Sequence, residues 1–118
     1  MDRSKTYLLI GEALASGDED LFVAEWATSS IFDADKSAAD PDYDEIVAYL
    51  HDIWTAAHLT VREIRRRTGL SQAAFAQRYC IPKRSLENWE RSSGTEARTC
   101  PPYVVIMLAQ ITGLVNIF

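Results

Sequence analysis

The chain has 118 residues, of which 47% are hydrophobic and 25% charged, a composition typical of a protein that buries a core. No apolar run approaches the roughly 18 residues needed to cross a membrane, and the first residues lack a secretory signal, so we expect a cytoplasmic protein. The formal net charge of −5 disfavours a nucleic-acid partner when it is taken alone.

The charges are divided unequally along the chain. Residues 1–57 carry 13 acidic and 3 basic side chains, whereas residues 58–118 carry 4 acidic and 9 basic side chains. The second half therefore has the positive charge that binding to phosphates requires. We predict two parts, an acidic helical extension over residues 1–57 and a second domain over residues 58–118. The extension is either a solubilising addition or a region for dimerisation or partner binding.

Three helices are predicted in the acidic half, over residues 4–15, 18–29 and 41–57, because apolar residues recur there at spacings of three and four. Residues 33–40 have the composition of an exposed loop, and Asp40-Pro41 is typical of a helix start. The residues predicted to face inward are Tyr7, Ile10 and Leu14 in the first helix, Leu21, Phe22 and Trp26 in the second, and Tyr43, Ile46, Val47, Leu50, Ile53, Trp54 and Ala57 in the third.

Shorter helices with clear boundary signals follow from residue 60 onward. Thr60 and Glu63 form a capping-box pattern, Gly69 suits a left-handed helix end, and Ser71 suits the cap of the next helix. A further helix is expected from Lys83, after Ile81-Pro82, and a last one from Pro101-Pro102 to about Thr112. No strand or repeat is predicted, so the expected fold class is all-α.

Residues 69–90 carry the motif that indicates function. They combine Gly-Leu-Ser-Gln at residues 69–72, a small Ala76, a turn residue Ile81, Leu86, and Trp89-Glu90. In this pattern the chain resembles the helix-turn-helix family of phage Cro and repressor proteins (XRE-like), over about residues 58–113. The resemblance implies a lambda-repressor-like bundle that binds double-stranded DNA as a homodimer and regulates transcription, most simply as a repressor.

The resemblance also assigns roles to individual residues. Lys83, Arg84 and Asn88 are implied to read base edges in the major groove, with lysine or arginine suited to guanine and asparagine to adenine. Glu90 resembles the family's glutamate that pairs inside the fold with a basic side chain. The residues expected to contact the DNA backbone or to support the recognition helix are Gln72, Ser85, Arg78, Arg91 and Arg98. The run Arg65-Arg66-Arg67 either contacts phosphates or is a solvated helix face.

Other function classes find little support in the sequence. There is no glycine-rich phosphate loop, metal-ligand cluster or nucleophile with an evident base, so we expect neither an enzyme nor a cofactor. A 19-residue gap separates Cys80 from Cys100, and Cys80 is expected to be a small buried hydrophobe.

Three points remain open in the sequence: the class of function, the connection after Glu90 and the place of the C-terminal tail. In the alternative to a DNA-binding regulator, the chain is a protein-interaction module, or the antitoxin of a toxin-antitoxin pair, whose acidic helices bind a protein partner. The connection after Glu90 is longer than is usual in the family. The apolar tail, residues 114–118, is expected either to lie on the last helix or to form part of a dimer contact.

Overall fold

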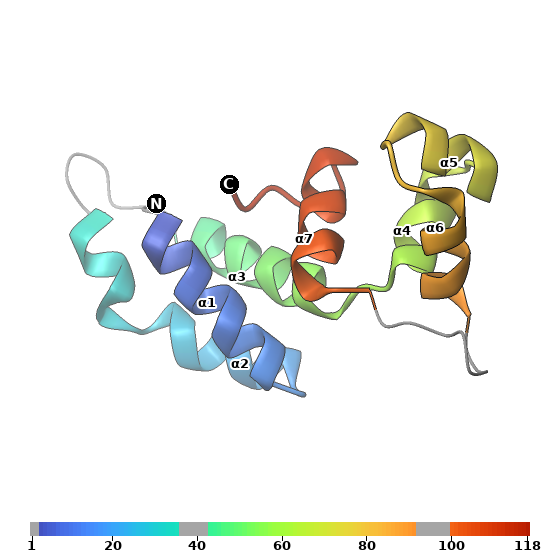
Figure 1. Cartoon of the computed structure of the whole chain (residues 1–118). Coiled ribbons are helices and arrows are strands. Elements are labelled where there is room, and N and C mark those ends of the chain that lie inside the picture. Colours follow the sequence, from blue (N-terminus) through green and yellow to red (C-terminus); the bar gives the residue numbers. More distant parts are fainter. Residues whose placement is uncertain (1–2, 36–42, 92–99) are drawn as a thin grey trace. The chain divides into compact units, whose positions relative to one another are not determined.

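The computed structural model describes residues 3–35, 43–91 and 100–118 (Figure 1). These residues form seven α-helices and one 3-10 helix and contain no strand, which confirms the predicted all-α class. Within these ranges no helix combines the length and the apolar character needed to cross a membrane. The chain divides into two compact units, one of Met1–His58 with Val115–Phe118 and one of Leu59–Leu114.

The first unit contains α1 (Arg3–Ala15), α2 (Glu19–Ala27), the 3-10 helix η1 (Ser30–Asp35) and α3 (Tyr43–His58). The Asp18 carboxylate caps α2 by accepting a 3.1 Å hydrogen bond from the backbone N–H of Leu21. Because η1 extends to Asp35, part of the predicted loop at 33–40 is the end of a 3-10 helix. Residues 36–42, which include the predicted Asp40-Pro41 helix start, lie outside the described residues.

The core of the first unit forms where α3 packs against α1 and α2. On α3 the predicted periodicity is confirmed at Ile46, Leu50 and Ile53, all of which are buried. The expected inner positions Val47, Trp54 and Ala57 are only half-buried, and Tyr43 is exposed.

The predicted inner face of α1 is wrong, although the helix itself is confirmed. The buried residues are Thr6, Leu9, Ile10 and Ala13, whereas Tyr7 is 59% exposed and Leu14 is 41% exposed. Periodicity did not identify the face because α1 is apolar around most of its circumference. The buried Thr6 hydroxyl is satisfied by a 2.7 Å hydrogen bond with the Tyr49 hydroxyl on α3.

The buried face of α2 also differs from the prediction. Phe22 is buried as expected, but the other buried residues are Val23 and Ala27. Leu21 is 63% exposed and Trp26 is half-buried. On this short helix, packing against α3 decides which of several adjacent apolar residues faces inward.

The two histidines of the first unit both make contacts within the unit. His51 Nδ1 lies 2.8 Å from the Glu19 carboxylate and so links α3 to α2. His58 ends α3, where its Nε2 donates a 2.8 Å hydrogen bond to the Ala13 carbonyl and its ring stacks on Trp54 at 4.0 Å. These contacts hold the middle of α3 against α2 and its C-terminal end against α1.

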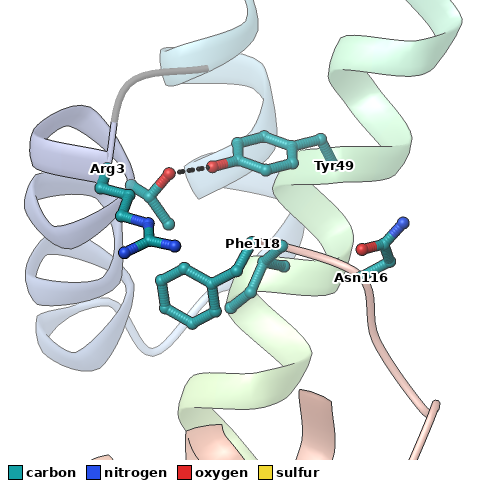
Figure 2. A pocket seen from close by; sticks show the side chains of 6 residues that line it. Arg3, Tyr49, Asn116 and Phe118 are labelled. Carbon is teal, nitrogen blue, oxygen red and sulfur yellow. Dashed lines mark hydrogen bonds between the residues drawn. The ribbon is translucent and has the colours of Figure 1, made fainter. Parts of the chain in front are cut away.

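The tail Val115–Phe118 is part of the first unit. Val115 and Ile117 are buried, the Asn116 backbone N–H donates to Asp52 at 3.3 Å, and the Phe118 and Tyr7 rings lie 5.9 Å apart. A cavity of about 270 Å³ lies beside the tail. Figure 2 shows the hydrogen bond between the Thr6 and Tyr49 hydroxyls, both of which line this cavity. The residues lining the cavity are Arg3, Thr6, Tyr49, Asn116, Ile117 and Phe118.

The second unit consists of α4 (Val61–Thr68), α5 (Gln72–Arg78), α6 (Lys83–Glu90) and α7 (Pro102–Ile111). The predicted capping box is confirmed, because Thr60 accepts from the Glu63 backbone N–H while the Glu63 carboxylate accepts from the Thr60 backbone N–H. The αL conformation of Gly69 (φ 75°) and the Ser71 cap are also confirmed. Helix α4 packs on both α6 and α7, and α5 packs on α6.

Helices α5 and α7 end in the same hydrogen-bonded motif. After α5, Ile81 N–H donates to the Ala76 carbonyl at 2.9 Å, and after α7, Leu114 N–H donates to the Ala109 carbonyl at 3.1 Å. This pattern is a Schellman motif, which requires a left-handed residue just after the helix. After α7 that residue is Gly113 (φ 80°), but after α5 it is Cys80 (φ 57°).

The prediction that Cys80 is buried is therefore wrong. Its thiol is exposed, because the left-handed residue of a Schellman motif lies at the outside of the turn. The residue serves as the connection between α5 and α6 and contributes nothing to the core.

Candidate nucleic-acid interface

Helices α5 and α6 form a pair of short helices joined by a tight turn. Phe75 and Ala76 on α5 and Leu86 on α6 are buried, while Ile81 in the turn and Trp89 are half-buried. The small Ala76 allows the two helices to approach closely. This packing fixes one side of α6 toward the interior and leaves the other side toward solvent (Figure 1).

A polar cluster ties α4, α5 and α6 together at the C-terminal end of α6. The Arg65 guanidinium on α4 donates from Nε and Nη2 to the Glu90 carboxylate at 2.7 and 2.8 Å, and from Nη1 to the Leu70 carbonyl at 3.1 Å. The Gln72 side chain at the start of α5 also helps to lower the pKa of Glu90. We call the side chains of Arg65, Gln72 and Glu90 the brace.

Within the brace, Arg65 and Glu90 form a charge pair that is joined by two hydrogen bonds and largely removed from solvent. The Glu90 side chain is 4% exposed and that of Arg65 is 17% exposed. Burial alone would raise the pKa of Glu90, but the hydrogen bonds and charge of Arg65, with the Gln72 side chain and the charge of Arg62, bring that pKa below its usual value. The pKa of Arg65 is raised by its hydrogen bond to Glu90, so both groups are held in their charged forms.

The resemblance predicted that Glu90 would pair inside the fold with a basic side chain, and the contact with Arg65 confirms that pairing. Arg65 itself was among the residues considered for phosphate contacts, and the structure instead places it inside the fold. A signal for this was present in the sequence. Arg65 lies one turn after the buried Val61 and next to the buried Ile64, on the inner side of α4, whereas Arg66 and Arg67 are exposed.

The solvent-accessible surface of α6 carries the three residues proposed from sequence to read bases. Lys83 and Arg84 are exposed and Asn88 is half-buried, with Arg84 and Asn88 one helical turn apart. The Lys83 ammonium lies 3.8 Å from the Glu87 carboxylate on the same helix. Both side chains of that pair are well exposed, so the contact is weak and Lys83 can move toward another anion.

The residues predicted to contact the DNA backbone occupy several elements. Ser85 is half-buried on α6, while Arg78 at the end of α5 and Arg91 after α6 are exposed. Gln72 is half-buried in the brace. Arg98 lies in residues 92–99, outside the described residues, together with the long connection after α6.

Comparisons with protein-family models, with curated proteins and with solved structures gave no match for this chain. Among the described residues, no three acidic, histidine or cysteine side chains come together as a metal ion would need. The case for function therefore depends on the geometry and charge of α4, α5 and α6.

Proposed function

We propose that this protein is a sequence-specific DNA-binding regulator of transcription that inserts α6 into the major groove of duplex DNA. The observation that carries the proposal is the brace together with the residues opposite it. One side of α6 is fixed by the buried Leu86 and by the Arg65 contact to Glu90, the opposite side presents Arg84 and Asn88, and Lys83 is exposed in the first turn. A helix held rigidly in this way can bring specific side chains to base edges.

The dimensions and charge of the second unit are consistent with such contact. An α-helix with side chains is about 10–12 Å wide, and the major groove of B-DNA is about 12 Å wide. The residues of Leu59–Leu114 include 9 basic and 4 acidic side chains, which favours binding to phosphates. The exposed arginines of this unit on α4, on α5 and just after α6 are Arg62, Arg66, Arg67, Arg78 and Arg91.

Regulation by this mechanism requires that the protein occupy an operator and exclude other proteins from it. A single α6 contacts only a few base pairs, so a second copy on an adjacent half-site, about one helical turn away, would give the required selectivity. The proposal is therefore a homodimeric repressor that acts in the cytoplasm on a near-palindromic site.

The experiment that tests the proposal is selection from random-sequence duplex DNA at a stated salt concentration, followed by sequencing. We expect enrichment of one motif by the full chain, and loss of preference at single positions of that motif in Arg84→Ala and Asn88→Ala. Each bidentate base contact discriminates by about 1–3 kcal/mol, which corresponds to roughly 5- to 150-fold between the right and the wrong base.

Arg67→Ala is the matched control. Arg67 is exposed on α4, so this substitution removes one positive charge, as Arg84→Ala does, without changing α6. It should weaken binding about equally for all sequences or leave binding unchanged, while the enriched motif stays the same. Absence of any enriched motif above non-specific binding would contradict the proposal and favour a protein-interaction module.

A further inference from the structure

The outward side of α1 is an apolar surface that the described residues of the first unit leave largely exposed, with the Phe118 ring lying against Tyr7 at its edge. At 100° per residue, five residues lie within an arc of roughly 120° on this side of the helix. Tyr7 is 59%, Leu8 50% and Leu14 41% exposed, and Gly11 and Ala15 are exposed between them. We call these five residues the outer face of α1. Between Tyr7 and Ala15 the single charged residue is Glu12, which lies outside this arc.

Gly11 lies at the centre of the outer face. A Cβ added there would meet nothing within 4 Å, so neither the fold of the first unit nor a left-handed conformation explains a glycine at this position. A glycine inside a helix costs about 0.5–1 kcal/mol relative to alanine. A surface glycine flanked by large apolar side chains is suited to the close approach of another helix backbone.

The outer face is complementary to itself about Gly11. The larger residues Tyr7 and Leu8 precede Gly11 by four and three positions, and Leu14 and Ala15 follow it by three and four positions. In an antiparallel crossing of two copies at Gly11, Tyr7 meets the partner's Leu14, and Leu8 meets the partner's Ala15. A two-fold axis makes each of these contacts twice, with a larger side chain opposite a smaller one.

The charges at the two ends of α1 are complementary in the same arrangement. Arg3 and Lys5 lie at the N-terminal end, and the acidic Asp18, Glu19 and Asp20 follow the C-terminal end. An antiparallel pair brings each basic end beside the acidic turn of the other copy, whereas a parallel pair would bring like charges together. Charge and side-chain size therefore favour the same orientation.

We propose that the outer face of α1 is the homodimer contact of this protein, formed by two α1 helices that cross antiparallel at Gly11. This inference adds the contact surface to the homodimer of the proposed function, but its test requires no DNA. A single helix face is small compared with a standard interface of about 800 Å² per partner, so the expected dissociation constant is micromolar.

Another exposed apolar stripe, on α7, provides the internal control for this proposal. Tyr103, Met107 and Ile111 are spaced by four residues and are 66%, 59% and 61% exposed. The described residues show no pairing of charges for that stripe comparable to the one at α1. Met107→Gln therefore tests the competing surface by replacing an apolar side chain with a polar one of similar size.

The test is sedimentation velocity of the full chain from about 1 to 200 μM, the range in which a micromolar dimer dissociates. The variant is Gly11→Gln, which places a long side chain at the crossing point and whose Cβ meets nothing within 4 Å in the monomer. Overpacking on both sides of a two-fold axis should raise the dissociation constant at least about 100-fold. Because glutamine favours helix, the thermal midpoint of the monomer should rise, which shows that the variant folds.

Three outcomes support the proposal when they occur together: the wild type dimerises, Gly11→Gln is monomeric, and Met107→Gln remains dimeric. Arg3→Glu should weaken the dimer, and Asp20→Arg in the same chain should restore it. A wild type that stays monomeric, a dimer that survives Gly11→Gln, or one that is lost in Met107→Gln alone would overturn the proposal. If the wild type is monomeric and still enriches a DNA half-site, this inference fails while the proposed function stands.

Discussion

Removing the charge of Glu90 should destabilise the second unit strongly, because the brace is a buried pair. The variant Glu90→Gln keeps the size of the side chain and leaves Arg65, which is 17% exposed, without its counter-charge. Losing one member of a buried pair costs about 3–5 kcal/mol. The glutamine still accepts one hydrogen bond and Arg65 keeps its contact to the Leu70 carbonyl, so we expect a loss of about 2–3 kcal/mol.

The assay is urea unfolding followed by circular dichroism, in which this loss corresponds to a midpoint lower by about 1–2 M. Glu87→Gln is the matched control on the same helix. Its 3.8 Å contact to Lys83 is exposed, and its midpoint should stay close to that of the wild type.

The same pair predicts a dependence on pH. The pKa of Glu90 is lowered in the folded state, so the pair stabilises the fold above the unfolded pKa of about 4.3, and its contribution is lost as the pH falls through the folded pKa. The stability difference between wild type and Glu90→Gln should therefore shrink as the pH is lowered from 7 to 2. A Glu90→Gln protein as stable as the wild type at pH 7, or a difference that persists at pH 2, would refute this account of the brace.

Three further predictions concern the turns and the thiols. Cys80→Gly should stabilise the protein by about 1 kcal/mol relative to Cys80→Ala in urea unfolding, because glycine adopts the left-handed conformation (φ 57°) without strain. Gly69→Ala should destabilise by about 1 kcal/mol at φ 75°, whereas Gly17→Ala, which meets nothing within 4 Å and is not left-handed, should be neutral or stabilising in the same measurement. With a thiol reagent at pH 8, Cys80 should react first, because burial raises the pKa of Cys100 to about 11; equal rates for the two thiols would contradict this.

The second unit could be predicted from sequence in considerable detail because its signals are local. Thr60 with Glu63, Gly69 and Ser71 each define a helix end through atoms within a few residues. The outward position of Arg84 followed from the burial of Leu86 on the same helix. Arg65 and its partner Glu90 are 25 positions apart in the sequence, so local signals could not identify the pair. The neighbouring Ile64, which is buried, indicated that Arg65 lies near the inner side of α4.

The first unit was predicted less well because its outcome depends on distant contacts. Helix α1 offers apolar residues on nearly every side, so only its packing against α3 decides that Leu9 faces inward and Tyr7 outward. Cys80 was misjudged for another reason. Free cysteine is usually buried, but the turn after α5 needs a residue in the left-handed conformation, and a cysteine in the sequence does not indicate that conformation.

The position of Val115–Phe118 has a consequence for the order in which the two units fold during synthesis. On the ribosome, α1, α2 and α3 emerge first, but the place that Val115 and Ile117 fill stays vacant until the whole second unit has been synthesised. The contact between Asn116 and Asp52 joins residues 64 positions apart, so closing it requires a long loop to be ordered first. Completion of the first unit is therefore expected to be a late step that follows folding of the unit inserted within it.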